Sequence, residues 1–479
     1  MQQVNLGMIG GGTVGSGVCH ALQLNGALLA SRLGVKVQVR KVAVKTLDEP
    51  RPYPIPPSLL TTDWRSVVED PRVDVVTELV GGTTLARTMI LAALKLGKPV
   101  ITANKALLSA HGEELFAAAQ KHRTNLYYEA SVCGGIPIIK ALREGFVGNR
   151  ILRLYGIVNG TCNYILTRMK LEGADFDAVL REAQAHGYAE AEPSLDVDGY
   201  DARHKIGILA SLAHGFWVNP ESIHVEGIRS ISQMDIKFAQ QLGYTIKLLG
   251  IIKTDPGQGE GAEGGGQVEK HGQDASATAH GRDARATTAD GQDPRARALP
   301  ANGTRIQVSV YPTLVPSSHV LANVNDVFNA VFVRGDIVGD TLFYGRGAGK
   351  DATASAVLSD LADAALDWKF GTKHRLPAFV PHERDGAVVP IAEVESRYFV
   401  RLDVQDVPGT LARIARIFGD AHIGISSVIQ PEGHVGASVP LIMMLHDAPN
   451  GAVTRALRRI GELPVVKSAP VMLRVENFE

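Results

Sequence analysis

The chain has 479 residues, 45% of them hydrophobic, which is enough to fill about three domains of ordinary size. Its 49 basic and 50 acidic side chains leave a formal net charge of −1. This balance gives no electrostatic footprint for nucleic acid or an anionic membrane, so we expect neither as a partner and predict small-molecule ligands. The cysteines Cys19, Cys133 and Cys162 lack the spacing of a disulfide framework or a zinc site and predict free thiols. The N-terminus lacks the pattern of a targeting leader, so we expect a cytoplasmic protein.

The first predicted elements form a dinucleotide-binding turn. An apolar strand at residues 4–9 is followed by a glycine-rich run at residues 10–15, GGGTVG, which fits G-x-G-x-x-G, and then by a helix at residues 18–29. Strand, turn and helix occur in the order that the motif requires. The alternative is a strand-to-helix turn with a purely structural role.

Three glycines of this run have a defined task in the motif. Gly10 makes the tight turn, Gly12 lets the backbone approach a pyrophosphate, and Gly15 lets the helix pack closely on the strand. Thr13 and Val14 lie between these glycines, ahead of the helix, whose N-terminal N–H groups favour phosphate. We therefore predict cofactor contacts at these five positions.

A second strand is expected at residues 36–44, and its end bears on the choice of cofactor. Where an NAD enzyme would carry an acid for the ribose hydroxyl, the chain has Val44-Lys45-Thr46. The basic residues Arg40, Lys41 and Lys45 favour a 2′-phosphate. NADP is the predicted cofactor, and NAD stays open because Asp48 lies close in the sequence.

Further strands at residues 73–79, 99–102 and 125–128, with a helix at residues 85–96, predict a doubly wound parallel sheet of the Rossmann type. Ligands of such sheets bind beyond the carboxyl ends of the strands. Thr102 and Lys105 lie at one of these ends and are candidate site residues. An ordinary surface lysine at a helix start is the alternative for Lys105.

A cluster of acids surrounds a single lysine further along the chain. It consists of Glu190, Glu192, Asp196, Asp198, Asp201 and Lys205. Asp201 and Lys205 are four residues apart and share one face of a helix. An ammonium among carboxylates suits a site that binds a zwitterion and moves a proton. The alternative is an exposed salt bridge worth ~0.3–0.5 kcal/mol.

Several longer segments make the family recognisable. GMIGGGTVGSGV, ITANKALL, YEASVCGGIPIIKALREG, GIVNGTCNYILTRM, GYAEAEPSLDVDGYDARHKIGILA and GRGAGKDATASAVLSDL follow one another within residues 1–365. In these segments the chain resembles homoserine dehydrogenase. The resemblance implies NAD(P)-dependent interconversion of L-homoserine and L-aspartate 4-semialdehyde.

The resemblance also implies roles for single residues. Lys205 matches the acid/base lysine and Lys105 a second essential lysine near the nicotinamide, while Glu190, Asp196 and Asp201 match acids that hold the amino acid. Two turns match segments that close over substrate and cofactor, namely Asn159, Gly160 and Thr161, and Gly347 with Gly349. A structural sodium site is implied at Glu129 and the backbone carbonyls of Val132, Gly134 and Ile136. A turn with a solvated Glu129 is the alternative to the sodium site.

The chemistry of the lysine predicts a pH dependence. Neighbouring carboxylates favour its ammonium form, which suits the general acid of semialdehyde reduction. Alcohol oxidation should therefore speed up as pH rises.

Cys133 and Cys162 are candidates for an alternative, thiohemiacetal mechanism, as in a cysteine-dependent semialdehyde dehydrogenase, but no histidine lies near them in the sequence. We interpret both thiols as small buried apolar groups.

The composition changes abruptly at residues 254–304, which are rich in Gly, Ala, Asp, Gln and Arg and predict a low-complexity insert. The insert is expected to extend a hairpin connection, either as a passive loop or as a segment that binds a partner.

The predicted domains are residues 1–135 for nucleotide binding, 136–365 for substrate binding, catalysis and dimerisation in a mixed α+β fold, 366–396 as a linker, and 397–479 as a C-terminal module.

The C-terminal module is predicted to have the order β-α-β-β-α-β of a ferredoxin-like fold. Its D-x-P-G turn before an apolar helix resembles that of an ACT domain, a small regulatory module that binds amino acids. The resemblance implies an effector site at Asp406 and Gly409, for which we expect L-threonine, and edge-to-edge pairing in a homodimer or homotetramer. A module that serves only as an oligomer contact is the alternative.

One alternative for the whole chain belongs to another class of protein. A nucleotide-sensing regulator could keep the Rossmann and ACT folds and lose catalysis. The presence of Lys105, Asp201 and Lys205 together speaks against it.

Overall fold

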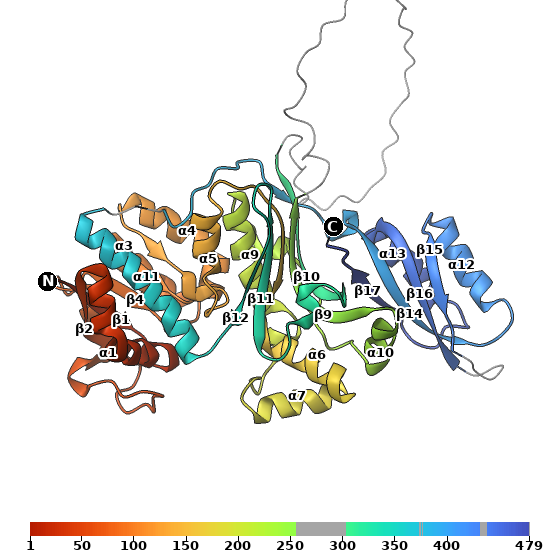
Figure 1. Cartoon of the computed structure of the whole chain (residues 1–479), viewed down its shortest axis with the longest axis horizontal. Helices are drawn as coiled ribbons and strands as arrows, with labels where there is room; N and C mark the ends of the chain where they lie inside the picture. The colour runs from red at the N-terminus through yellow and green to blue at the C-terminus, as the bar shows by residue number, and fades with distance from the viewer. Residues whose placement is uncertain (255–302, 373–374, 376, 432–437, 479) are drawn as a thin grey trace, which may run out of the picture.

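The computed structural model describes residues 1–254, 303–372, 375, 377–431 and 438–478. The predicted insert lies almost entirely outside the described residues. Figure 1 shows a nucleotide-binding domain at one end, a central domain, and the C-terminal module at the other end. Within the described ranges, no helix is long and apolar enough to cross a membrane.

The nucleotide-binding domain is built on a sheet of six parallel strands in the order β3-β2-β1-β4-β5-β6. The strands are β1 (Gln2–Ile9), β2 (Val35–Ala43), β3 (Leu60–Thr61), β4 (Val75–Glu78), β5 (Val100–Thr102) and β6 (Leu126–Tyr127). The helices between them are α1 (Thr13–Leu33), α2 (Arg65–Val68), α3 (Thr84–Lys95) and α4 (Lys105–Lys121). The predicted Rossmann-type sheet is thus confirmed, and its order reverses between β1 and β4, where such sheets bind ligands.

One further helix of this domain comes from far along the chain. α11 (Lys350–Phe370) packs against α1 and contributes Ala354, Val357 and Leu361 to the core around β1. A Cβ atom at Gly17 of α1 would lie 3.0 Å from the carbonyl oxygen of Lys350, so the two helices approach closely. Most of α11 falls within residues 136–365, the predicted substrate-binding domain, because a helical pattern does not reveal which sheet the helix covers.

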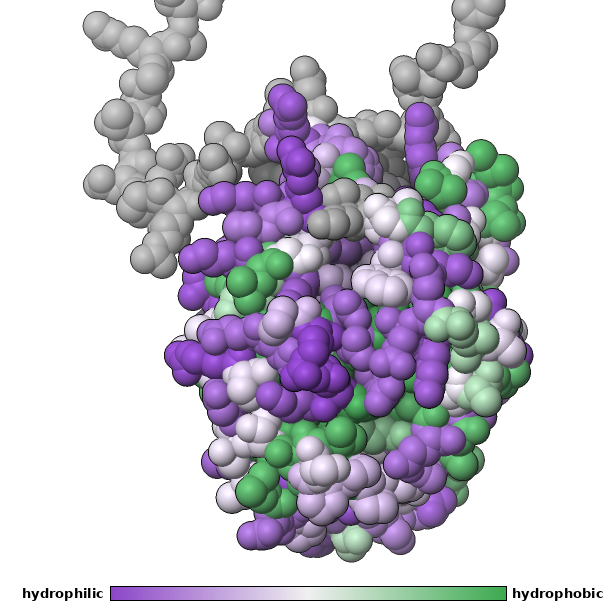
Figure 2. All heavy atoms as spheres, turned by 90° about the vertical axis from the view of Figure 1, so that its left-hand side faces the viewer, coloured by the Kyte–Doolittle hydropathy of each residue, from purple (hydrophilic) through white to green (hydrophobic). Residues whose placement is uncertain are grey.

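The nucleotide-binding end of the molecule has a mixed surface. Figure 2 views this end, where hydrophilic side chains predominate and hydrophobic ones form small separate groups. The exposed hydrophobic residues here include Leu24 and Leu28 of α1 and Leu85 of α3. Small apolar groups of this kind are ordinary on a protein surface.

The central domain contains five antiparallel strands in the order β12-β11-β7-β9-β10. These are β7 (Ile151–Ile157), β9 (Tyr244–Thr254), β10 (Arg305–Pro316), β11 (Phe328–Gly335) and β12 (Gly339–Arg346), and the short strands β8 (His224–Val225) and β13 (Ala387–Val388) pair with β10. Its helices are α5 (Ile138–Lys140), α6 (Gly160–Glu172), α7 (Phe176–Ala185), α8 (Ser194–Val197), α9 (Tyr200–His214) and α10 (Gln233–Gln241). β9 and β10 flank the insert and pair with each other from Tyr244 to Thr254, as the predicted hairpin requires.

The C-terminal module has the predicted order β-α-β-β-α-β, and its four strands are arranged β17-β14-β16-β15. Its elements are β14 (Glu395–Gln405), α12 (Thr410–Asp420), β15 (Ile425–Ile429), β16 (Ser438–Pro449), α13 (Asn450–Gly461) and β17 (Val471–Val475). The buried residues of α12 include Thr410, Ile414, Ile417 and Phe418, whose spacing gives one apolar face toward the sheet. β17 also pairs with β10, so the module and the central domain share one continuous sheet.

Candidate active site

Helix α9 carries the aspartate and the lysine that the sequence singled out. The Lys205 ammonium donates hydrogen bonds of 2.7 Å to Asp201 Oδ2 and to the carbonyl oxygen of Val158, at the end of β7. Asp201 is 5% exposed and Lys205 is 7% exposed. The alternative of an exposed salt bridge is therefore excluded.

A second lysine reaches the same carboxylate from the other domain. Lys105 begins α4 directly after β5, and its Nζ lies 3.2 Å from Asp201 Oδ1. The preceding Asn104 fixes this helix start, because its Oδ1 accepts from Leu107 N and its Nδ2 donates to the carbonyl oxygen of Gly82. Asp201 thus joins two ammonium groups across the boundary between the nucleotide-binding and central domains.

Asn159 brings a second acid into the cluster. Its Nδ2 donates to Asp196 Oδ1 at 2.7 Å and to Asp201 Oδ2 at 2.8 Å, and its Oδ1 caps α6 by accepting from Cys162 N at 2.8 Å. Thr161, next to Gly160 in the first turn of α6, donates to the carbonyl oxygen of Tyr188 at 2.7 Å. The turn of Asn159, Gly160 and Thr161 therefore stands beside the acids.

Glu190 is not part of this cluster. It is exposed, and among the described residues its carboxylate makes no ion pair. The residues that meet are two acids, Asp196 and Asp201, and two lysines, Lys105 and Lys205.

Burial and charge act in opposite directions on the central pair. Burial alone would raise the pKa of Asp201, but the charges of Lys205 and Lys105 lower it well below its usual value. Burial likewise disfavours the ammonium of Lys205, yet Asp201 raises its pKa above the ordinary value. The pKa of Asp196 is raised by burial. The ammonium form of Lys205 is therefore favoured.

The two cysteines near the site are buried thiols. Burial raises the pKa of Cys133 and raises that of Cys162 well above its ordinary value. The Cys162 thiol donates to the carbonyl oxygen of Asp196 at 3.2 Å. Because the thiolate is the nucleophile, raised pKa values argue against a cysteine mechanism.

The glycine-rich turn has the geometry that a dinucleotide needs. Gly10 has φ +107°, and a Cβ there would lie 2.6 Å from the carbonyl oxygen of Leu79. A Cβ at Gly15 would collide with the carbonyl oxygen of Gly10. Within the described residues, nothing lies within 4 Å of a Cβ atom placed at Gly12, which leaves room for a pyrophosphate beside the N-terminus of α1, where Thr13 and Val14 begin the helix. The residues present fit a dinucleotide cofactor.

The basic residues near β2 occupy different positions. Arg40 Nε lies 3.3 Å from Asp70 Oδ2, and the Lys41 ammonium donates to the carbonyl oxygen of Ser66 at 3.3 Å. Both side chains are therefore engaged within the domain. Lys45 is exposed just beyond β2, at the carboxyl edge of the sheet.

Thr102 and Glu78 form a hydrogen-bond network, in which Glu78 is a residue that the sequence patterns did not predict. The Thr102 hydroxyl donates to Glu78 Oε2 at 2.7 Å, and Glu78 Oε1 accepts from Val80 N at 2.9 Å. Thr102 and Glu78 are both fully buried, and the Glu78 carboxylate orders the turn after β4 through Val80 N while the Thr102 hydroxyl holds its other oxygen. An acid at the end of an apolar strand, three residues before a pair of glycines, was the signal for Glu78.

The turn of Gly347 and Gly349 leads into α11, beside the loop that follows β2. Gly349 is the N-cap of α11 with φ +122°, and the ammonium of the next residue, Lys350, lies 4.3 Å from the ring centroid of Tyr53. Tyr53 stacks on His20 of α1 at 3.9 Å. The loop, α1 and α11 are therefore joined next to the glycine-rich turn.

Glu129 lies in the loop for which the resemblance implies sodium. Its carboxylate accepts from Ile139 N at 3.0 Å and from Lys140 N at 2.8 Å, and its own N–H donates to Asp360 Oδ2 at 2.9 Å. Glu129 is 2% exposed, which excludes the alternative of a solvated side chain. Burial raises its pKa to about 7 and raises that of Asp360 well above the ordinary value.

This loop fits a hard cation chemically. Glu129 and Asp360 place two carboxylates side by side in a buried position, and carboxylate and carbonyl oxygens are the ligands that a hard cation prefers. Within the described residues, no group of three or more His, Cys, Asp or Glu side chains could hold a metal ion. Any ion here would therefore depend on the carbonyls of Val132, Gly134 and Ile136.

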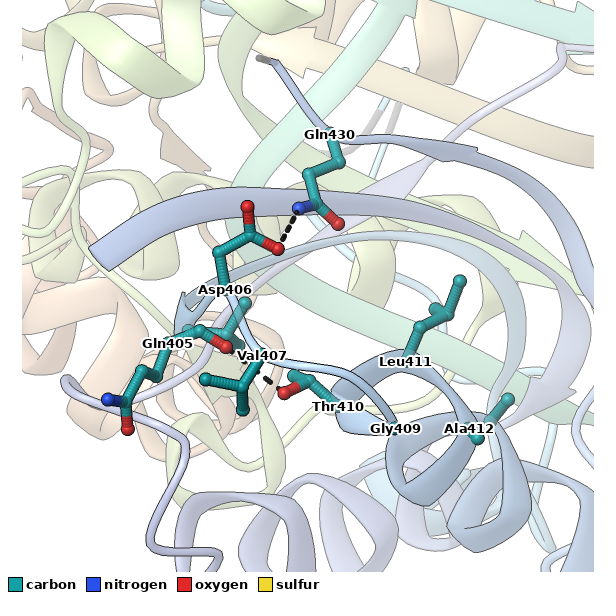
Figure 3. Close-up of a pocket in the computed structure, with 10 residues that line it drawn as sticks. Gln405, Asp406, Val407, Gly409, Thr410, Leu411, Ala412 and Gln430 are labelled. Carbon is teal, nitrogen blue, oxygen red and sulfur yellow. Dashed lines mark hydrogen bonds between the residues drawn. The ribbon is translucent and has the colours of Figure 1, made fainter. Parts of the chain in front are cut away.

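The predicted effector residues line a separate pocket of about 410 Å³ in the C-terminal module. Figure 3 shows it between the loop before α12 and the end of β15. Gln430 Nε2 donates to Asp406 Oδ1 at 3.0 Å, and the Thr410 hydroxyl donates to the carbonyl oxygen of Gln405 at 3.0 Å. Gly409 has φ +88° and is the N-cap of α12.

A dinucleotide turn on a Rossmann-type sheet, with a buried lysine paired to an aspartate at the carboxyl edge, defines an oxidoreductase with an NAD-binding domain. Residues 10–129 match the family model "Homoserine dehydrogenase, NAD binding domain", and residues 137–362 match the model "Homoserine dehydrogenase". The chain belongs to the homoserine dehydrogenase family.

Relatives match the chain along its full length. It is 40% identical to a homoserine dehydrogenase of Synechocystis sp. over 98% of this chain and 99% of the relative. It is 39% identical to one of Pseudomonas aeruginosa over 100% of both chains. The crystal structure of a homoserine dehydrogenase from Thiobacillus denitrificans matches with a TM-score of 0.84 and 38% identity, over 100% of this chain and 99% of that chain.

Proposed function

We propose that this protein catalyses the reversible NAD(P)-dependent interconversion of L-homoserine and L-aspartate 4-semialdehyde, a step of threonine, methionine and isoleucine biosynthesis. The observation that carries the proposal is the buried Asp201 carboxylate shared by Lys205 and Lys105. It joins a proton donor to the carboxyl edge of the nucleotide-binding sheet.

The proposed mechanism assigns proton transfer to Lys205. A bound nicotinamide cofactor supplies or accepts the hydride. During semialdehyde reduction the Lys205 ammonium gives a proton to the carbonyl oxygen, and during homoserine oxidation the neutral amine takes the hydroxyl proton. Asp201 keeps the ammonium oriented through its 2.7 Å hydrogen bond. Asp196, together with Asp201, attracts the ammonium of the substrate.

NADP is the proposed preferred cofactor, with NAD as the second choice. Lys45 supports this choice, because it lies exposed at the end of β2, where a 2′-phosphate would need a positive charge. Arg40 supports it less, since Asp70 already binds its guanidinium.

A structural sodium ion is proposed at Glu129. The burial of the Glu129 and Asp360 side chains supports the proposal, because a bound positive charge would compensate two buried carboxylates. The ion would fix the loop that leads from the nucleotide-binding domain to the central domain.

Feedback control through an ACT domain is the last part of the proposal. L-threonine would bind in the pocket near Asp406 and Gly409, with its carboxylate at the N-terminus of α12, and lower the activity of a homodimer or homotetramer. The ferredoxin-like strand order and the pocket support this proposal.

One assay tests the proposed function. The purified full chain should reduce NADP, and NAD less efficiently, only when L-homoserine is added, and L-threonine should slow the reaction. An absence of homoserine-dependent reduction with both cofactors would contradict the proposed activity. Unchanged rates with L-threonine would contradict only the regulation.

A further inference from the structure

Asn329 lies where three parts of the candidate site meet. It is the second residue of β11 and is 1% exposed. A Cβ atom at Gly347 would collide with the amide nitrogen of Asn329, and a Cβ atom at Gly160 would lie 3.6 Å from Asn329 Oδ1. Its Nδ2 donates to Cys133 Sγ at 3.5 Å. The side-chain amide is therefore enclosed by both glycine turns and by the loop that begins at Glu129.

The amide oxygen of Asn329 lacks a partner. Oδ1 is buried, and within the described part of the chain it accepts no hydrogen bond. A buried polar atom without a partner is unfavourable, and in a native protein it calls for an explanation. A ligand that donates an N–H group would satisfy it.

A neighbouring asparagine shows what a structural role looks like here. Asn163 is 2% exposed, and its Nδ2 donates to the carbonyl oxygens of Val324, Asp326 and Phe328. Its Oδ1 accepts from the Lys247 ammonium at 3.1 Å. Both polar atoms of the Asn163 side chain thus form hydrogen bonds within the protein, whereas Asn329 Oδ1 accepts none from the described residues.

The surroundings of Asn329 indicate which N–H group would bind. The turn of Gly347 is the one implied for the cofactor, and the turn of Gly160 is the one implied for the substrate, so Asn329 stands at their junction. Asn159, next to Gly160, donates to Asp201, the partner of the Lys205 ammonium, so the turn beside the amide leads to the proton donor. A neutral amide oxygen suits a neutral donor, because the acids Asp196 and Asp201 suit the substrate's ammonium better.

We propose that Asn329 binds the nicotinamide carboxamide of the cofactor, its Oδ1 accepting a hydrogen bond from the carboxamide N–H at the junction of the two glycine turns; this inference rests on the proposed function. Asn329 thereby positions the ring for hydride transfer next to the substrate.

Calorimetric titration of the full chain tests this contact without turnover. The probes are NADP and its 3-acetylpyridine analogue, in which a methyl group replaces the carboxamide nitrogen. Asn329→Ala should raise the Kd of NADP roughly five- to tenfold, since one hydrogen bond is lost. The same variant should change the Kd of the analogue less than about twofold, because the analogue has no N–H to donate. Asn329→Leu, which keeps the side-chain size without polar atoms, gives the same comparison if the alanine variant does not fold.

Asn163→Ala is the matched control. It removes a buried amide with structural partners, so it should lower the Tm and leave the ratio of the two Kd values as in the wild type. Equal losses for NADP and the analogue in the Asn329 variants would overturn the inference. A raised KM for L-homoserine with unchanged cofactor affinity would also overturn it, by assigning Asn329 to the substrate. A wild-type chain that reduces no cofactor with homoserine would instead refute the proposed function.

Discussion

Arg401 of β14 donates hydrogen bonds to both carboxylate oxygens of Asp235, at 2.6 Å through Nε and at 3.2 Å through Nη2. Asp235 is fully buried and also caps α10 through Ser232. The ion pair therefore joins the C-terminal module to the central domain. Two more pairs cross the same boundary, Arg474 with Glu226 and Lys253 with Glu476.

These pairs predict that the module contributes to stability. Arg401→Met should lower the free energy of unfolding by roughly 3 kcal/mol, because it leaves the Asp235 carboxylate buried without its counter-charge. Arg87→Met, which breaks an exposed pair with Glu114, is the control and should have no measurable effect. Urea unfolding monitored by circular dichroism would measure both. Equal midpoints for the two variants would contradict the prediction.

The contacts between the C-terminal module and the central domain make a truncated chain unsuitable for testing regulation. Deletion of the module would remove β17 from β10 and leave Asp235 unpaired, so loss of activity in a truncated chain would have two explanations. A point substitution in the pocket separates them. Asp406→Ala should abolish the response to L-threonine and leave the uninhibited rate unchanged, as measured by initial rates over a threonine titration. An inhibition curve identical to that of the wild type would refute the effector site.

Lys205 is predicted to carry most of the proton-transfer catalysis. Lys205→Met should lower kcat by ~10²–10⁴-fold, the usual range for a positioned acid or base, while the Kd of NADP stays within about twofold. Lys121→Met, at the exposed end of α4, is the control and should retain the wild-type kcat. Wild-type turnover in the Lys205 variant would end its assignment as the proton donor.

The pH dependence follows from the raised pKa of Lys205. Because the ammonium persists to higher pH than in a free lysine, kcat/KM for homoserine oxidation should keep rising toward alkaline pH, and semialdehyde reduction should fall there. Asp201→Asn removes the partner that raises the pKa, so burial then lowers it. The oxidation profile of this variant should shift to lower pH, and an unshifted profile would show that Lys205 does not control it.

The Glu129 loop predicts a sodium effect with a definite sign. The pKa of Glu129 rises from 4.5 to about 7 on burial, so the folded chain binds more protons than the unfolded chain between these values and loses stability as pH rises through them. Sodium would compensate the ionised form. NaCl should therefore raise the Tm above that in choline chloride at pH 8, and the difference should shrink below about pH 7. Glu129→Gln should remove it, and equal Tm values in both salts would exclude the ion.

The sequence by itself determined the local units of this protein. The glycine-rich turn depends on backbone geometry within six residues, and Gly10 and Gly15 have the environments that the motif predicts. The four-residue spacing of Asp201 and Lys205 fixed their common helix face, and alternating apolar patterns predicted the Rossmann-type sheet and the C-terminal β-α-β-β-α-β order. Such features are encoded by neighbours in the chain.

Only the tertiary structure decided which distant residues meet. Lys105 reaches Asp201 from another domain, whereas Glu190, close to Asp201 in the sequence, remains exposed. Arg40 is bound by Asp70, and in the described part of the chain the Oδ1 atom of Asn329, between two glycine turns, accepts no hydrogen bond. These outcomes depend on how sheets and helices pack, because side-chain contacts between remote segments arise only when the backbone brings them within hydrogen-bonding distance.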